Sequence, residues 1–170
     1  SLNNFADYTL TIKTGTQNQT YIVDQKGTES TTAVGVGVTV AGGAVVRTIT
    51  NSNVDRVLLT IEIPTLQIIK DNGDIVGHSV QFTISVQYNS GGYSVVRTET
   101  ISGKTSNSYS KSFTIGLSGA FPVDIKVTRL SADETSAKRQ NLTNWNSFTT
   151  IIDEKLTYPN SAVVFMEMDA

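Results

Sequence analysis

The feature that most constrains this chain is a period of two in its apolar residues. In SVQFTISVQY (79–88), apolar side chains alternate with Ser, Gln and Thr. An extended strand sends successive side chains to opposite faces, so this pattern gives the one apolar and one polar face of a half-buried antiparallel strand. RVLLTIEI (56–63) has the same rhythm and ends before Pro64, which cannot donate to a sheet ladder. The sequence therefore predicts antiparallel β-structure.

Turn residues separate the predicted strands. Asn72-Gly73 and the NSGG stretch at 89–92 favour tight turns, because Asn and Gly tolerate positive φ. Strands that recur about every ten residues, with turns between them, are typical of a sandwich or barrel. We predict an all-β fold: an antiparallel β-sandwich with an N-terminal β arm. The residues predicted to share apolar faces are Val57, Leu59, Ile61, Ile63, Val80, Phe82, Ile84, Val86, Tyr88, Tyr109, Phe113, Ile115, Val123, Ile125 and Val127.

The first part of the chain follows a different pattern. YTLTIKT (8–14) predicts a strand, whereas GVGVTVAGGAVV (35–46) is rich in glycine. Its strand pattern places Val34, Val36, Val38 and Val40 on one face and Gly35 and Gly37 on the other. Glycine on one face permits close approach of another backbone or leaves the register weakly specified. We therefore expect residues 1–52 to form an arm and residues 53–170 to form the sandwich domain.

The chain closes on the apolar run AVVFMEM (162–168). Chain ends are usually frayed and polar, so such a run needs a strand to pair with. We expect that partner within the chain, and we expect the chain to be a piece of a longer protein.

Composition excludes several classes of function. The absence of cysteine excludes disulfides, thiolate zinc sites and cysteine nucleophiles. The single histidine, His78, excludes two-histidine metal sites and is interpreted as a surface or strand-start residue. A net charge of −2 indicates no nucleic-acid partner, and no apolar stretch reaches the length of a membrane span. Charged residues are only 16%, which is typical of hydroxyl-rich structural or extracellular β proteins.

Motifs that resemble reactive sites have structural interpretations. DNGD (71–74) lacks the ligand register of a calcium loop and predicts a hairpin turn. The glycine-rich stretch fits neither nucleotide-binding pattern. Asp153 and Glu154 face opposite ways on a strand, so they cannot act together on one bond. SADETSAKRQNLT (131–143) has capping-box spacing but no apolar stripe, which indicates a polar loop. We predict no catalytic, cofactor-binding or metal-binding residues, and no enzymatic activity.

Candidate interface residues are aromatic residues and apolar residues of the glycine-rich arm and the terminal strand, which the predicted sandwich core does not need. Trp145 is either an exposed recognition aromatic or a core anchor, and the core is favoured because sandwiches commonly bury one tryptophan. Tyr93 follows a turn and suits an interface or a packing role equally. The full candidate set is Val36, Val38, Tyr93, Trp145, Val164, Phe165 and Met166.

The chain resembles two known families. From residue 55 onward, the order of its predicted strands resembles an immunoglobulin or fibronectin type III-like β-sandwich. SYSKSFTIGLSGAFPVDIKVTRL (108–130) resembles part of a fibronectin type III module, without the tyrosine that this family carries at the start of the second strand. More of the chain resembles the tail tip attachment (host-specificity) protein J family of lambda-like siphophages, in a hub-associated region. The stretches that carry this resemblance are TIKTGTQNQTYI, VVRTITNSNVDRVLLTIEIPTLQ, DNGDIVGHSVQFTISV, ISGKTSNSYSKSFTIGL, IKVTRLSADETSA and TTIIDEKLTYPNSAVV.

The family resemblance implies a structural role in a virion tail tip made in the bacterial cytoplasm. It implies a trimeric assembly with other tail-tip proteins, and a chain that continues past the last strand. Two hypotheses follow: a structural module that acts through protein–protein contacts, or a recognition module. In the second, the loops DNGD, NSGGY and 131–146 would bind a host glycan or outer-membrane protein. A bacterial adhesin or pilus-type domain fits the composition but not the ordered motifs.

Overall fold

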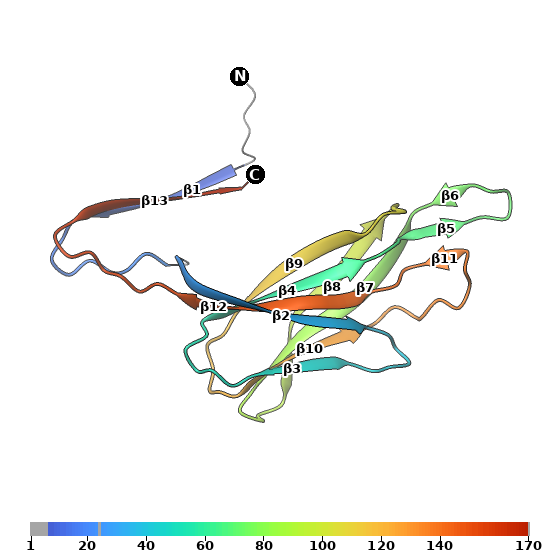
Figure 1. Ribbon diagram of the computed structural model, residues 1–170, viewed down its shortest axis with the longest axis horizontal. Coiled ribbons are helices and arrows are strands. Elements are labelled where there is room, and N and C mark those ends of the chain that lie inside the picture. Colours follow the sequence, from blue (N-terminus) through green and yellow to red (C-terminus); the bar gives the residue numbers. More distant parts are fainter. Residues whose placement is uncertain (1–6, 24, 170) are drawn as a thin grey trace, which may run out of the picture. The chain divides into compact units, whose positions relative to one another are not determined.

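The computed structural model describes residues 7–23 and 25–169, and every regular element within them is a β-strand. The chain divides into two compact units. Unit 1 contains both ends of the chain, up to Thr28 and from Ile152 onward, and unit 2 is Glu29–Ile151 (Figure 1). No helix that is long and apolar enough to cross a membrane occurs among the described residues.

Unit 2 is built on two four-stranded sheets. The first has the order β3 (Val45–Ile49), β10 (Val123–Arg129), β7 (His78–Tyr88), β8 (Tyr93–Gly103). The second has the order β2 (Lys26–Gly37), β12 (Asn144–Asp153), β4 (Arg56–Ile63), β9 (Tyr109–Gly116). A small third sheet joins β11 (Arg139–Gln140), β5 (Gln67–Ile69) and β6 (Ile75–Val76). All pairs of known register are antiparallel, which confirms the predicted all-β fold.

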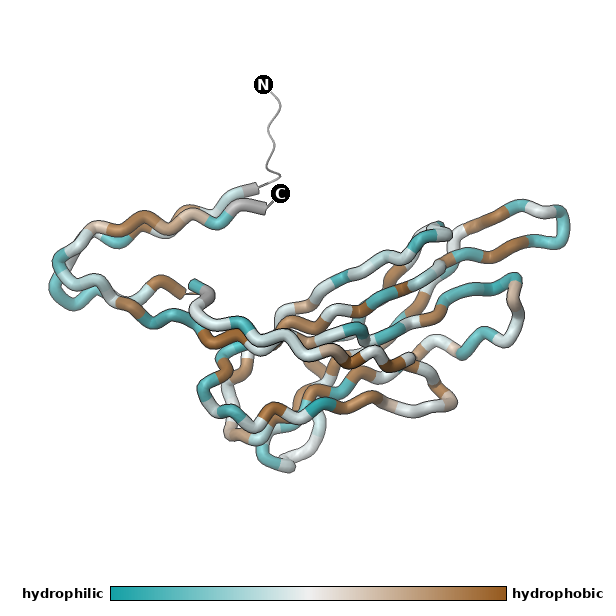
Figure 2. Tube along the Cα trace, in the orientation of Figure 1, coloured by the Kyte–Doolittle hydropathy of each residue, from teal (hydrophilic) through white to brown (hydrophobic). Residues whose placement is uncertain are grey.

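The core of unit 2 follows from the alternation in the sequence. Along β4 every second residue is buried, and β7 and β10 bury their apolar sets in the same way. Figure 2 shows hydrophobic and hydrophilic residues alternating along the strands of unit 2. Phe82 of β7 meets Phe113 of β9 edge to face, with ring centroids 5.8 Å apart, so the two sheets pack against each other. Burying each such side chain stabilises the fold by about 1.5–3 kcal/mol. Tyr109, expected on the same face, is 45% exposed at the start of its strand.

Two predicted turns are confirmed by their backbone geometry. Gly73 has φ +87° between β5 and β6, and its N–H donates to the Lys70 carbonyl at 3.0 Å. Asn89, Ser90 and Gly92 all have positive φ between β7 and β8. The 131–143 stretch is a polar loop that contains only the two-residue strand β11.

Trp145 is a core residue. Its side chain is fully buried, and its Nε1 donates to the Ser147 carbonyl at 2.9 Å. A register shift between Trp145 and Ser147 marks a β-bulge, which moves the inward positions of β12 onto Phe148 and Ile151. The core interpretation is therefore confirmed, and an exposed recognition role for this side chain is excluded.

The glycine-rich stretch differs from its prediction. Gly35 has φ +60°, so the strand alternation breaks there and the four valines do not share one environment. Val38 is fully buried, whereas Val36 and Val40 are exposed. The predicted arm of residues 1–52 is also divided between the two units. Its residues up to Thr28 belong to unit 1, and the rest belongs to unit 2. There β2 and β3 are edge strands of the two sandwich sheets. The predicted boundary near residue 53 falls between β3 and β4, inside unit 2.

Unit 1 contains a two-stranded antiparallel sheet, which we call the ribbon. It pairs β1 (Asp7–Thr14) with β13 (Ala162–Asp169), from Asp7 opposite Asp169 to Thr14 opposite Ala162, without a register shift. The terminal apolar run therefore has its expected partner within the chain. That partner is the first strand, at the other end of the sequence (Figure 1).

Candidate interaction surfaces

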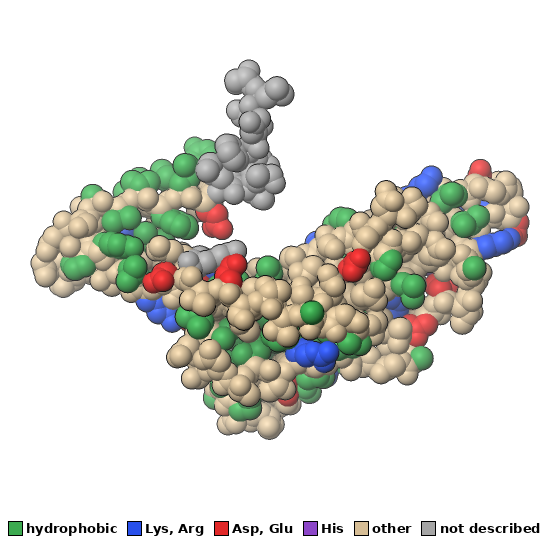
Figure 3. Space-filling model, viewed as in Figure 1, with side chains coloured by type: hydrophobic (Ala, Val, Ile, Leu, Met, Phe, Trp, Pro, Cys, Tyr) green, Lys and Arg blue, Asp and Glu red, His purple; other side chains and the backbone are tan. Residues whose placement is uncertain are grey.

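The ribbon exposes one apolar face. Directly opposite residues of an antiparallel pair point to the same face, so Leu10 with Met166 and Ile12 with Val164 share one side. Figure 3 shows hydrophobic side chains gathered along the ribbon. On this apolar face the exposed fractions run from 47% for Leu10 to 65% for Tyr8. The face comprises Tyr8, Leu10, Ile12, Val164 and Met166.

The opposite side of the ribbon is covered over part of its length. Thr11 pairs with Phe165 and Lys13 pairs with Val163, and these four residues are half-buried. Lys13 Nζ donates to the Thr20 hydroxyl at 2.8 Å, so the segment after β1 folds back toward this strand. The ribbon therefore has one open apolar face and one partly covered face.

Two chain segments that continue from the ribbon are tied together, and we call the described residues 15–23, 25 and 154–161 the neck. Gln19 makes the central contacts: its Oε1 accepts from Gly15 N at 2.9 Å, and its Nε2 donates to the carbonyls of Tyr158 and Ser161. At the far end of the neck, Glu154 N donates to the Gln25 carbonyl at 2.7 Å. The two segments thus stay side by side along the neck.

Gly15 allows this close approach. It has φ +86°, and a Cβ there would lie 3.1 Å from the backbone nitrogen of Ala162. Any other residue would be strained by its φ, and its Cβ would lie unusually close to the backbone of β13.

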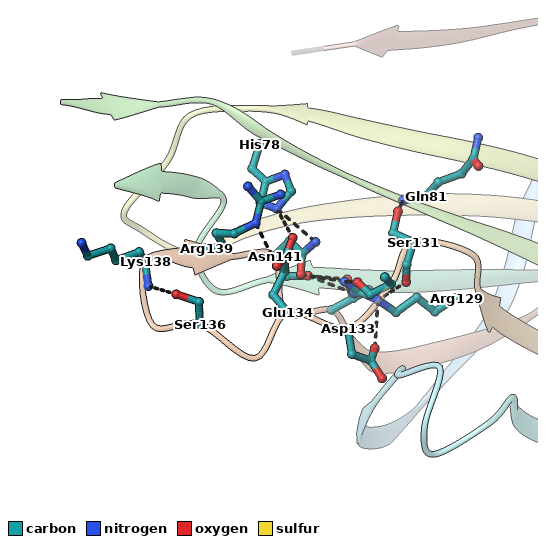
Figure 4. Close-up of polar contacts among 12 residues, drawn as sticks. His78, Gln81, Arg129, Ser131, Asp133, Glu134, Ser136, Lys138, Arg139 and Asn141 are labelled. Carbon is teal, nitrogen blue, oxygen red and sulfur yellow. Dashed lines mark hydrogen bonds and ion pairs between the residues drawn. The ribbon is translucent and has the colours of Figure 1, made fainter. Parts of the chain in front are cut away.

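A buried arginine organises the loops at one end of unit 2. Arg129 follows Val123, Ile125 and Val127 in the inward-facing positions of β10, and its side chain is only 2% exposed. Its guanidinium donates five hydrogen bonds, which matches its donor capacity. The acceptors are the carbonyls of Ser131, Ala132 and Asn141, the Asn141 side-chain oxygen and the Thr143 hydroxyl (Figure 4).

Two carboxylates extend this network. Asp133 lies 3.3 Å from Arg129 and accepts the N–H groups of Val40 and Ala41, each at 2.9 Å. These backbone donors, Ala41 first, hold the pKa of Asp133 below its ordinary value. Glu134 accepts from Arg139 at 2.9 Å and contacts His78 at 2.9 Å, and the Arg139 bond is the main reason that its pKa is lowered (Figure 4). The network fixes the 131–143 loop against the loop between β2 and β3.

A polar cluster lies around Asp124 on the outer side of the first sheet. Asp124 accepts from Thr48 at 2.6 Å and from Gln87 at 2.9 Å, and the Tyr93 hydroxyl lies 3.4 Å away. Lys126 Nζ lies 3.7 Å from the Tyr93 ring centroid, within cation–π range. The pKa of the Tyr93 hydroxyl is raised mainly by burial and to a lesser extent by the nearby Asp124 carboxylate. The cluster leaves Tyr93 39% exposed.

Charges also line the edge strands β8 and β9. Glu99 of β8 pairs with Arg97 and with Lys111 of β9, and the Lys111 hydrogen bond is the main cause of its lowered pKa. Arg97 lies 4.9 Å from the centroid of the Phe113 ring. Charged side chains on edge strands discourage pairing with another sheet. Among the described residues, no three His, Asp or Glu side chains gather in a way that could hold a metal ion.

Comparison with known proteins adds to this geometry. A family model described as the tip attachment protein J, FNIII-A domain, matches residues 28–154. The chain belongs to the tip attachment protein J family.

Two members of this family are similar over nearly the whole chain. The tip attachment protein J of Escherichia phage SECphi27 is 33% identical over 168 residues, which are 98% of this chain and 14% of that protein. The corresponding protein of Escherichia phage SECphi4 is 36% identical over 169 residues, 98% of this chain and 15% of that protein. The chain therefore spans about one seventh of the length of these relatives.

Membership of the protein J family bears out three predictions. The resemblance is confirmed at the level of the family, the FNIII-A match confirms a fibronectin type III-like sandwich, and the structural nature of the family agrees with a chain that is not an enzyme. The FNIII-A match, residues 28–154, nearly coincides with unit 2, Glu29–Ile151. The ribbon strands β1 and β13 lie just outside the domain.

The candidate interface residues fall into two groups. Val36, Tyr93, Val164 and Met166 are exposed and Phe165 is half-buried, so their interface role stays a prediction. Val38 and Trp145 are fully buried. For Val38 this corrects the interface assignment, and for Trp145 it agrees with the favoured core interpretation. Sequence reasoning missed Gly15, Gln19 and Arg129. A signal existed for Arg129 alone, because it extends the alternating apolar series of β10 by one inward position.

Proposed function

We propose that this chain is a structural module of a phage or prophage tail tip, acting by protein–protein contacts in tail-tip assembly and host attachment. The observation that carries the proposal is the match of the FNIII-A domain to unit 2, a compact sandwich. The charges of the Arg129 network and of the β8–β9 edge are engaged in internal contacts, as suits a rigid module.

The partners in this proposal are other tail-tip proteins and further copies of the same protein, in a trimeric assembly. The region would be associated with the hub of the tip, and the protein would lie in the virion after synthesis in the bacterial cytoplasm. Support comes from the relatives, which carry the name tip attachment protein J.

Removal of unit 2 from the full-length protein tests this role. The residues just before and just after unit 2 lie side by side. A Cβ on Gly27 would be 3.0 Å from the carbonyl oxygen of Ile152. A two-residue turn can therefore replace residues 29–151. We expect phage that carry this deletion to form fewer complete tails, counted by electron microscopy. Tails in normal number that adsorb normally would contradict the proposal.

A matched control separates contact from mere spacing. In a second phage, an unrelated cysteine-free sandwich of similar size replaces residues 29–151. If contacts made by this domain matter, the foreign sandwich does not restore tail assembly. Full restoration would show that the domain only occupies space, which contradicts a role in specific contacts.

Host recognition is the second candidate function. The observation that favours it is the exposed Tyr93 ring beside Lys126 and Asp124, an aromatic and polar surface of the kind that binds polar ligands. The deletion phage distinguishes the two functions. Normal tails that fail to adsorb to host cells would assign recognition to unit 2.

A further inference from the structure

An open pocket lies between edge strands of the two sandwich sheets. Among the described residues, β8 pairs only with β7 and β9 pairs only with β4, so each sheet has a free edge here. The pocket has a volume of about 360 Å³, at the lower end of the range of ligand-binding cavities. Its lining comes from residues 100–105 together with Leu66, Tyr109 and Lys111. It is separate from both the Arg129 network and the Asp124 cluster.

The pocket has apolar and aromatic walls. Ile101 of β8 is 7% exposed and Leu66 is 2% exposed, and both line the pocket. Two backbone hydrogen bonds of 2.9 Å between Leu66 and Thr105 fix Leu66 against the segment that follows β8. Tyr109, at the start of β9, adds an aromatic ring that is largely open to solvent. An apolar side chain that enters this space removes apolar surface from water, which is favourable.

The rim of the pocket is basic. Two lysines, Lys104 and Lys111, line it and no carboxylate does. Lys111 is paired with Glu99, whereas Lys104 is exposed and forms no ion pair within residues 7–23 and 25–169. This leaves one unpaired cation beside an apolar cavity, in a chain whose net charge is −2. An occupant that carries a carboxylate close to an apolar group complements both features.

The free edge of β8 supplies backbone groups at the same place. Alternate residues of an antiparallel edge strand turn their N–H and C=O groups away from the partner, so residues 100–103 offer such groups along the pocket. The charges that protect this edge, Arg97 and Glu99, lie before this stretch, which is itself uncharged. An extended polypeptide added here would direct alternate side chains toward the pocket.

A polypeptide suits this site better than a small molecule does. Sites for small ligands usually have a few precisely placed polar groups that fix the ligand's orientation. Here neither Lys104 nor Lys111 is buried, so neither charge is held in place by packing. The regularly spaced polar groups are those of the strand edge, which match another extended backbone.

We propose that the pocket and the adjoining edge of β8 dock an extended, acidic segment of another tail-tip protein, which adds as a strand beside residues 100–103. An apolar side chain of that segment fills the space against Ile101 and Tyr109. A carboxylate one or two residues away pairs with Lys104. The inference rests on the proposed function, which it deepens by naming a site of contact.

A second copy of this chain offers no such segment from unit 2. The described carboxylates of unit 2 lie in paired strands or in loops that hydrogen bonds hold in place. None of them belongs to a free extended segment that could add to another sheet. The docked segment is therefore assigned to a different protein of the tail tip.

Site-specific photo-cross-linking in assembled phage tests the proposal. Tyr109→p-benzoylphenylalanine puts a photoreactive ring at the pocket, and Tyr93→p-benzoylphenylalanine, at a tyrosine of similar exposure in the Asp124 cluster, is the control. Purified particles are irradiated without host cells, and the linked peptides are identified by mass spectrometry. We expect Tyr109 to link to one segment of another tail-tip protein, with Asp or Glu within two residues of the linked side chain. The control should give at least tenfold less of this product.

A charge reversal tests the part played by Lys104. In the phage with the photoreactive group at position 109, Lys104→Glu should lower the yield of the cross-link at least tenfold. Lys70→Glu, at another exposed lysine, should leave the yield unchanged. Loss of complete tails with Lys104→Glu but not with Lys70→Glu would show the same dependence. The fluorescence of Trp145 in the isolated chain checks that both variants fold.

Several results would overturn the proposal. They are cross-links to a second copy of this protein, cross-links to host material that need added cells, and a yield that Lys104→Glu does not change. Absence of tail-tip cross-links would also overturn it, provided that Ser102→p-benzoylphenylalanine, on the strand edge, gives none either. Failure of the proposed function is measured separately, by the number of tails in phage that lack unit 2. Fewer tails in those phage, without cross-links at the pocket, would remove this site and keep the structural role.

Discussion

Leu10 of β1 lies directly opposite Met166 of β13, and these apolar side chains are 47% and 52% exposed. The next pair along, Thr11 with Phe165, points to the other side and is half-buried. The contrast between adjacent pairs shows that the open apolar surface belongs to one face of the ribbon. Four further properties of the molecule can be tested on the chain itself.

Gly15→Ala should destabilise the ribbon selectively. A positive φ costs a residue with a side chain roughly 1–2 kcal/mol, and the added Cβ would also press on the backbone of Ser161 and Ala162. We expect amides of β1 and β13 to exchange about tenfold faster or more, because each 1.4 kcal/mol is about a factor of ten. Hydrogen exchange with mass spectrometry measures this.

Gly43→Ala is the matched control. Gly43 has a similar φ of +77°, but no atom lies within 4 Å of its added Cβ, and it belongs to unit 2. We expect the substitution to lower the free energy of unfolding of unit 2, measured by the fluorescence of the only tryptophan, Trp145. Amide exchange in the ribbon should stay as fast as in the parent chain. Equal exchange in the ribbon for both variants would contradict the close approach at Gly15.

Gln19→Ala should loosen the neck. The substitution removes the hydrogen bonds to Gly15, Tyr158 and Ser161, each with a net contribution of about 0.5–1.5 kcal/mol. We expect faster trypsin cleavage at Lys155, which lies exposed in the returning segment. Asn18→Ala, at the exposed neighbouring position, serves as the control. Equal cleavage rates for the two variants would argue against a clamp at Gln19.

Arg129→Met should destabilise unit 2 strongly. It removes the partner of five acceptors in a buried setting, a kind of change that costs about 3–5 kcal/mol in the free energy of unfolding. Arg139→Met removes a surface cation that is 46% exposed and should cost no more than about 1 kcal/mol. Urea unfolding followed by Trp145 fluorescence compares them. Similar costs for both variants would refute the central role of Arg129.

Acid should weaken unit 2 through its paired carboxylates. The folded state lowers the pKa of Asp133, Glu134 and Glu99, so the unfolded chain takes up protons first as the pH falls. Their stabilisation is present above the ordinary carboxyl pKa values of 3.8 and 4.5 and is lost as the pH falls through the lowered values.

The Asp133→Asn variant isolates one of these carboxylates. We expect it to be less stable than the parent chain at neutral pH, with a difference that shrinks in acid. Asp71→Asn, at a side chain that is 97% exposed, is the surface control and should change the free energy of unfolding by no more than about 1 kcal/mol. A difference between parent and Asp133→Asn that stays constant with pH would contradict the assignment.

Much of unit 2 can be predicted from the sequence because the pattern of residues within each strand and turn specifies that element. The alternation in β4, β7 and β10 specifies which side chains face the core, and Asn-Gly chemistry specifies the turns around Gly73 and Gly92. The burial of Trp145 could also be predicted, because a large aromatic side chain buries more apolar surface in the core of a sandwich than any other.

The ribbon could not be predicted in this way. Its pairing joins the first and last strands, and alternation within a strand says nothing about which distant strand will be its neighbour. The break at Gly35 was hidden for a similar reason, because glycine is compatible with both extended and positive-φ backbone. The division into two units therefore required the structure.

Electron microscopy of phage that lack unit 2, Glu29–Ile151, tests the central claim most directly. If unit 2 makes contacts that the tail tip needs, these phage form fewer complete tails than the parent phage. We predict this loss both for the deletion and for the phage in which an unrelated sandwich replaces the domain. Complete tails in normal number that adsorb normally would contradict a structural role of unit 2 in the tail tip.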